Sequence, residues 1–229
     1  MHRLGKYKAT DSMSDLICTN YRMLLVMGRF GIAMGFGDQN IEEVCHTHHV
    51  DVDTFLTVVN LLLDEDGTVD FSNTSVSLES LVSYLHNSHD YFLNFRLPVI
   101  RAKLLEVLKT PQNDLAKAII HYFDEYVAEV RKHMMYEEDT VFPYIHALLS
   151  GKKQTKYNIS IFRKQHDQIE SRLTEFKHII IKYYPAESTN EINSVLFDIF
   201  NCEHDLASHN AIEDRLLIPA IMNLEEDKT

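Results

Sequence analysis

The sequence is poor in the residues that interrupt regular structure. Its 229 residues include only 7 glycines and 5 prolines, and it has no tryptophan. Because glycine and proline mark most turns, such small numbers argue against the many short strands and tight turns of an all-β fold. We therefore predict long helices joined by short connections.

Cysteines and long apolar runs are scarce as well. The three cysteines, Cys18, Cys45 and Cys202, lie far apart in the chain, and an odd, scattered set does not indicate a disulfide framework. The sequence contains no run of about 18 apolar residues, so it predicts no transmembrane helix. Residues 1–15 lack the apolar segment of a secretory signal. These absences favour a cytoplasmic protein with no membrane segment.

Positive charge is in deficit, since 22 lysines and arginines face 34 acidic residues and the formal net charge is −12. A protein that binds nucleic acid through phosphate contacts needs a basic face, and the sequence shows none. We therefore do not expect nucleic acid as a partner. The unusual feature is histidine, which occurs 13 times and is the commonest metal ligand among side chains.

The N-terminal part of the chain predicts a few helices. Residues 15–30 and 50–63 have helical patterns, and the glycine-rich segment 28–40 predicts a turn or tight loop. Asn40 and Glu43 have the spacing of a capping box at the start of a short helix. We expect a small helical domain here.

A polar segment at residues 64–75 separates this part from the rest of the chain. We place the domain boundary there, which gives a small N-terminal helical domain at residues 1–74 and a second domain at residues 75–229. Four long helices are predicted in the second domain, at residues 76–109, 114–149, 156–184 and 188–224. Long helices with short links predict an all-α fold with an up-down-up-down four-helix bundle.

Ionisable residues interrupt the apolar stripe of each predicted long helix. The residues concerned are His89, His133, Glu137, His166, His209 and Glu213. Two His–Glu pairs, in HMMYE (133–137) and HNAIE (209–213), have a four-residue spacing that puts both members on one helix face. Unpartnered burial would cost several kcal/mol per group, so we expect these groups to be paired, hydrogen-bonded or bound to a cation. The neighbouring acids, Glu138 and Asp139, are expected on the solvated side.

The residue types in this set indicate a centre with two metal ions. Four imidazoles and two carboxylates exceed the ligands of one tetrahedral zinc. Nitrogen together with carboxylate oxygen suits iron or manganese, and carboxylates from facing helices bridge pairs of ions inside four-helix bundles. The sequence contains no zinc-protease, serine-nucleophile, phosphate-loop or CxxC motif.

Three segments carry a resemblance to a known family: HMMYEEDTVFP (133–143), RKQHDQIE (163–170) and HNAIEDRLLIP (209–219). They resemble the hemerythrin-like non-haem di-iron proteins, above all the members that repair iron centres under nitric-oxide and oxidative stress. The resemblance spans nearly the whole chain. It implies two iron ions in an oxo- or hydroxo-bridged centre, with Glu137 and Glu213 as bridging carboxylates. It also implies that His133, His166 and His209 are ligands.

The ligand from the first long helix is left open between two histidines. The segment YLHNSHDYFLNFRLP (84–98) resembles the family's first helix, and the ligand falls on His89 or His86. Counting back from Leu97–Pro98 points near Asp90. The apolar stripe favours His89, with His86 in reserve.

The N-terminal domain departs from the family at one point. FGIAMGF (30–36) resembles the family's small domain, which carries an adjacent cysteine pair after its Phe-Gly-Ile. Here Met34-Gly35-Phe36 stands in that place, so we do not expect functions that depend on the thiol pair. Cys45 is either a remnant of that pair or a small buried apolar residue, and we favour the second interpretation. The segment CHTHH (45–49) could bind a metal, but three histidines clustered on one short polar segment favour solvated side chains.

The leading functional hypothesis is a cytoplasmic di-iron protein of nitrosative or oxidative stress. It would bind oxygen, nitric oxide or a peroxide, or supply iron for the repair of iron–sulfur clusters. The alternatives are a sensor that signals to a protein partner and a store of oxygen or iron. Residues 38–63 contain no lysine or arginine, which argues against DNA reading by this part. The expected partners are a small diatomic ligand and iron–sulfur proteins. We expect a monomer or a homodimer. The sequence does not decide whether the protein is an enzyme with catalytic turnover.

Overall fold

The computed structural model describes most of the chain as helix. The described residues are 6–64, 76–108, 114–151, 159, 167–185 and 189–226. Within them the only strand-like feature is one isolated bridge between Ser12 and Asn40, which confirms the all-α class. None of the described helices combines the length and the apolar character that crossing a membrane would require.

The chain forms two compact units, and most of the boundaries between them fall inside the long helices. One consists of Met1–Ser88, Leu148–Ser150 and Ala211–Thr229, and the other of His89–Ala147 and Gly151–Asn210. The predicted domain boundary between residues 74 and 75 lies outside the described residues, because the description stops at residue 64 and resumes at residue 76.

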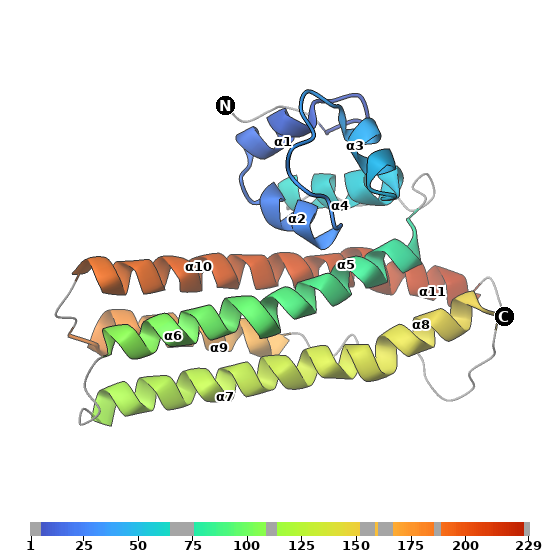
Figure 1. Ribbon diagram of the computed structural model, residues 1–229. Coiled ribbons are helices and arrows are strands. Elements are labelled where there is room, and N and C mark those ends of the chain that lie inside the picture. The colour runs from blue at the N-terminus through green and yellow to red at the C-terminus, as the bar shows by residue number, and fades with distance from the viewer. Residues whose placement is uncertain are drawn as a thin grey trace. The chain divides into compact units, whose positions relative to one another are not determined.

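The first unit begins with four short helices: α1 (Met13–Thr19), α2 (Met23–Arg29), α3 (Ile41–Thr47) and α4 (Val52–Leu63) (Figure 1). The prediction of one helix over residues 15–30 is wrong, because the backbone leaves the helix at Asn20, with φ −142° and ψ 99°. The glycine-rich segment is a loop, as predicted. Gly31 and Gly35 have φ of 71° and 102°, a region that glycine adopts at little cost.

The starts of α3 and α4 are fixed by side-chain caps. The Asn40 side chain accepts a hydrogen bond from the Glu43 N–H at 2.9 Å, and the Glu43 carboxylate accepts one from the Asn40 N–H at 3.0 Å. This confirms the predicted capping box. Asp51 caps α4 by accepting from the Thr54 N–H at 2.8 Å. Local sequence therefore determines where both helices begin.

The apolar core of the first unit is drawn from all of these helices. Its fully buried members include Met13, Leu16, Met27, Ile41, Val44, Cys45, Phe55, Val58 and Val59. Helix α5 (Leu78–Asp90) joins this core through Tyr84, whose ring centroid lies 4.9 Å from that of Phe30. Asn87 donates to the carbonyl of Arg29 at 2.8 Å, so polar contacts as well as packing tie α5 to α2.

The cysteines of this unit differ in their surroundings, and we expect them to differ in reactivity. Cys18 is exposed and Cys45 is buried. Burial, with a smaller effect from Asp51, raises the pKa of the Cys45 thiol from 9.0 to about 12, which lowers its thiolate fraction about a thousandfold. Iodoacetamide at pH 8 should therefore modify Cys18 in the folded protein and Cys45 only after unfolding, as peptide mass spectrometry would show.

The Cys18→Ser variant is the control for this labelling. Its modification should fall to background, because Cys45 and Cys202 are both buried. Rapid modification of Cys45 in the folded variant would contradict the expectation.

The described residues include parts of all four predicted long helices, and in three of these the described part contains a π-helix that was not predicted from the sequence. The first is α5, η1 (Tyr91–Arg96) and α6 (Leu97–Val107); the second is α7 (Asp114–Tyr136), η2 (Glu137–Val141) and α8 (Phe142–Leu149). The described part of the third is α9 (Asp167–Tyr183), and the fourth is α10 (Thr189–Ile212), η4 (Glu213–Leu217) and α11 (Ile218–Glu226). Together they confirm the up-down-up-down bundle.

A proline explains each π-helix. Pro98, Pro143 and Pro219 are each the second residue of the α-helix that follows a π-helix. Proline has no N–H, and in an α-helix its ring clashes with the carbonyl four residues back. The residue before each proline instead donates to the carbonyl five residues back, as Phe142 does to Glu137 and Ile218 to Glu213. The wider turn lets each helix continue through its proline.

The second unit is held by a core shared among η1, α6, α7, α9 and α10, which lie side by side in Figure 1. Its buried members include Phe92, Ile100, Leu104, Phe123, Tyr126, Leu173, Phe176, Val195 and Ile199. The rings of Phe123 on α7 and Phe176 on α9 are 5.3 Å apart. Buried polar residues, among them His89, His133, Glu137 and His209, lie on the same helical segments as this apolar core.

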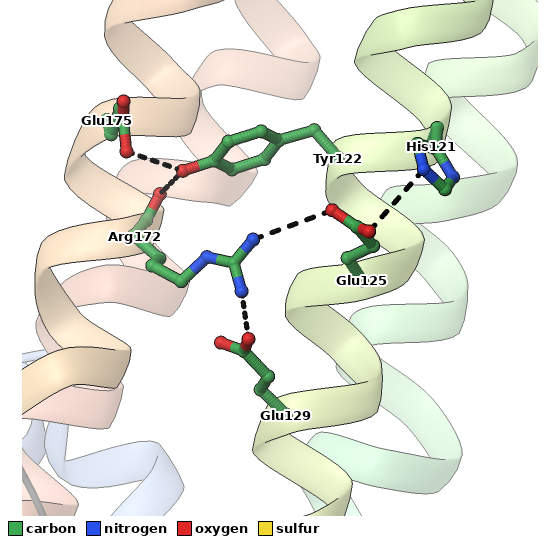
Figure 2. A network of polar contacts seen from close by, with 6 residues as sticks. All are labelled: His121, Tyr122, Glu125, Glu129, Arg172 and Glu175. Atoms are coloured by element: carbon green, nitrogen blue, oxygen red, sulfur yellow. Dashed lines mark hydrogen bonds and ion pairs between the residues drawn. The ribbon is translucent and has the colours of Figure 1, made fainter.

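A polar network on the surface joins α7 to α9 (Figure 2). Arg172 pairs with Glu129 and lies 3.7 Å from Glu125, both on α7. Its guanidinium also lies 5.2 Å from the centroid of the Tyr122 ring, and the Tyr122 hydroxyl donates to Glu175 at 2.8 Å. Exposed ion pairs contribute about 0.2–1 kcal/mol each, so the network supports the register of the two helices more than it supplies their stability.

Candidate metal centre

Four buried side chains converge between the long helices. His89, Glu137, His209 and Glu213 each offer one ligand atom, and these atoms all lie within 4.8 Å of one another. None of the four is more than 3% exposed. His89 lies in the last turn of α5, His209 lies in the last turn of α10, and Glu137 and Glu213 are the first residues of η2 and η4.

The carboxylate of Glu137 lies between two imidazoles. Its Oε2 is 2.9 Å from Nε2 of His89, and its Oε1 is 2.9 Å from Nε2 of His133. His133 is one helical turn before Glu137 and is 8% exposed. One carboxylate thus presents a separate oxygen to each of two histidines, which is the orientation that a bridging carboxylate requires.

The π-helices position the two carboxylates. Glu137 and Glu213 each start a π-helix, and the carbonyl of each accepts the five-residue hydrogen bond described above. Single π turns inside α-helices occur frequently at functional sites. The prolines that cause these turns therefore act on the part of each helix that carries a candidate ligand.

His89 makes a second polar contact that the sequence analysis missed. Its Nδ1 lies 2.7 Å from Oε1 of Glu138, whose side chain is 22% exposed. The expectation that Glu138 faces solvent is wrong, whereas Asp139 is exposed as expected. The reason is η2, because a π turn rotates less per residue than an α turn and keeps positions 137 and 138 on the side of His89. In the sequence, the residue that indicates this π turn is Pro143.

Aromatic rings cover the histidines. Phe142 stacks on His89 with ring centroids 5.5 Å apart and an angle of 7° between the planes. Phe92 meets His209 edge-on at 5.9 Å, and the rings of His89 and His209 are 5.2 Å apart. An apolar shell of this kind limits the access of water to a metal site and lowers the local dielectric constant.

The buried charges shift one another's pKa values. Burial raises the pKa of Glu137, but the contacts with His133 and His89 outweigh burial and hold that pKa well below its ordinary value. Burial lowers the pKa of His89, but the contacts with Glu137 and Glu138 outweigh it and raise that pKa. The contacts therefore favour the charged forms of both side chains.

The spacing of these atoms fits a metal ion. His89 Nε2 and both carboxylate oxygens of Glu137 are fully buried and take part in no hydrogen bond of acceptable geometry, although buried polar groups are nearly always hydrogen-bonded. Two ligands about 2.1 Å from an octahedral ion, at right angles to each other, lie about 3 Å apart. The 2.9 Å between His89 Nε2 and Glu137 Oε2 matches this, and nitrogen with carboxylate oxygen suits iron or manganese.

The structure places the candidate ligands as follows. It brings His89, Glu137, His209 and Glu213 together, and His133 adjoins Glu137. His166 lies outside the described residues. The reserve candidate His86 is exposed, as is Asp90. In segment 45–49, Cys45 is buried as expected, and the side chain of His46 is 71% exposed.

Comparison with known proteins agrees with this geometry. The family model of the hemerythrin HHE cation binding domain matches residues 80–221. The chain is also similar to the "Iron-sulfur cluster repair protein YtfE" of Salmonella paratyphi B and to that of Salmonella newport, each 22% identical over 188 residues, or 80% of this chain and 83% of the relative. The resemblance drawn from the sequence is thereby confirmed. Because the family match covers more than half of the chain and spans the whole cluster of buried histidines and glutamates, the protein belongs to the hemerythrin HHE cation-binding family.

Proposed function

We propose that the protein is a non-haem di-iron protein of the nitrosative and oxidative stress response. Its iron pair binds oxygen or nitric oxide species, and the iron is available for the repair of iron–sulfur clusters. The observation that carries the proposal is the Glu137 carboxylate, which offers one oxygen to His89 and the other to His133. The similarity to proteins named for iron–sulfur cluster repair supports the same conclusion.

The ligands divide between two ions in this proposal. His89 and His209, whose rings are 5.2 Å apart, hold the first iron. His133, on the other oxygen of Glu137, holds the second iron together with His166, which is assigned from the sequence. Glu137 and Glu213 bridge the two, and their negative charges offset part of the charge of the metals.

An iron pair supplies redox chemistry and an open coordination position for a diatomic ligand. The residues of the chain supply the surroundings. Phe142 and Phe92 cover the imidazoles of His89 and His209, and an apolar shell of this kind limits the access of water to the metals. The three cysteines are free thiols in the structure, which supports a reducing cytoplasm as the place of action.

Metal analysis with optical spectroscopy tests the proposal. Protein produced with ample iron should contain about two irons per chain, show the absorption of an oxo-bridged pair, and change its spectrum with nitric oxide. The loaded protein should also restore an iron–sulfur enzyme damaged by nitric oxide, whereas protein stripped of iron by a chelator should not. Zinc alone, or no metal despite ample iron, would overturn the proposal.

A further inference from the structure

Glu138 holds His89 from the side opposite the cluster. The ligand assignment above uses Nε2 of His89 and leaves its Nδ1 contact with Glu138, at 2.7 Å, without a role. We propose that Glu138 is a positioning residue that accepts the Nδ1 proton of His89 and thereby fixes the tautomer whose Nε2 lone pair faces the metal. The inference rests on the proposed function, since it concerns the same centre.

The choice of tautomer matters because a neutral imidazole has one N–H and one lone pair. If the proton sat on Nε2, the ring could not bind an ion placed beside Glu137. A carboxylate next to Nδ1 draws the proton to that nitrogen, and a hydrogen bond to an ionised acceptor is stronger than one between neutral groups. The second nitrogen is then free to act as a ligand.

The ring has little freedom to adopt another orientation. His89 is 3% exposed, and Phe142 stacks flat against it. Glu137 meets Nε2 at 2.9 Å and Glu138 meets Nδ1 at 2.7 Å, so two consecutive carboxylates hold opposite ends of one imidazole. Adjacent side chains in an α-helix point about 100° apart, and η2 is what allows both to reach the same ring.

Matched variants of adjacent acids test the role of Glu138. Glu138→Ala should lower the affinity of one iron by about 10- to 100-fold, the usual effect of removing the carboxylate partner of a histidine ligand. Glu138→Gln should restore most of this affinity, because its amide oxygen still accepts the Nδ1 proton. Asp139→Ala, which removes an exposed acid from the next position, should leave the affinity unchanged. Competition with a chelator measures all three.

Spectroscopy separates positioning from a general effect on folding. In the Glu138→Ala protein, Mössbauer spectra should show one iron of the pair altered and the other as in the wild type. Should that variant fail to fold, Glu138→Asp keeps the charge but shortens the reach to Nδ1, and it should lower the affinity in the same direction. Iron affinity and Mössbauer spectra like those of the wild type in Glu138→Ala, or in Glu138→Asp if the alanine variant does not fold, would overturn the proposal.

Nitrogen NMR of protein stripped of metal gives a test that does not depend on iron. At a pH where the ring is neutral, His89 of the wild type should carry its proton on Nδ1, and Glu138→Ala should move it to Nε2, where the Glu137 carboxylate lies 2.9 Å away. A proton on Nε2 in the wild type would overturn the role of Glu138. A wild type that binds no iron would instead contradict the proposed function, so the two failures are distinguishable.

Discussion

Glu137→Ala should abolish the binding of both irons, whereas His133→Ala should leave about one iron per chain. The two changes differ because the Glu137 carboxylate contacts both His89 and His133, while His133 contacts only one of its oxygens. Iron analysis of purified protein, with circular dichroism to show that the helices persist, measures the difference. Glu213→Ala should behave as Glu137→Ala does.

His86→Ala is the matched control, since His86 lies on the same helix as His89 but is exposed. It should keep the full iron content, and His89→Ala should lose iron. Iron loss in the His86 variant with retention in the His89 variant would move the first-helix ligand to the reserve position. Full iron content in both glutamate variants would contradict the bridging assignment altogether.

Pro143→Ala should lower iron affinity by at least about tenfold without destabilising the bundle. Alanine restores an N–H that can bond to the Asp139 carbonyl four residues back, so that η2 can relax into an α-helix. Glu137 and Glu138 would then turn away from the two ends of the His89 ring. Because proline in a helix interior costs up to about 3 kcal/mol relative to alanine, thermal unfolding of protein stripped of iron should occur at the same temperature or higher.

Pro185→Ala serves as the control, because Pro185 is exposed and follows the end of α9, away from the π-helices. Its iron affinity should equal that of the wild type. A Pro143 variant with unchanged affinity and an intact π turn would show that the turn is held by packing and not by the proline.

The sequence predicted the parts of the structure that depend on periodicity and local caps. The apolar stripe favoured His89 over His86, and the structure buries the first and exposes the second. The capping box of Asn40 and Glu43 was predicted from spacing alone and is present. Both features follow from contacts within a few turns of one helix.

The parts that were missed depend on a break in that periodicity. A π turn adds a residue that an apolar pattern of 3.6 residues per turn does not register, so η2 was predicted as α-helix and Glu138 was placed in solvent. The break between α1 and α2 at Asn20 was also missed, since apolar residues such as Leu16 and Leu24 continue across it. In the second long helix, Pro143 was the residue that indicated the π turn. The apolar pattern continues past this proline, so the pattern alone predicted an uninterrupted α-helix.

The distance between glutamate and proline is the same in the second and fourth long helices. Five residues separate Glu137 from Pro143 and Glu213 from Pro219, and their sequences, EDTVF and DRLLI, share little beyond an initial acid. Inserting one residue into an α-helix shifts everything beyond it by about 1.5 Å and rotates it by about 100°. These segments should therefore accept many substitutions but no insertion or deletion, because their length determines the depth at which each carboxylate enters the bundle.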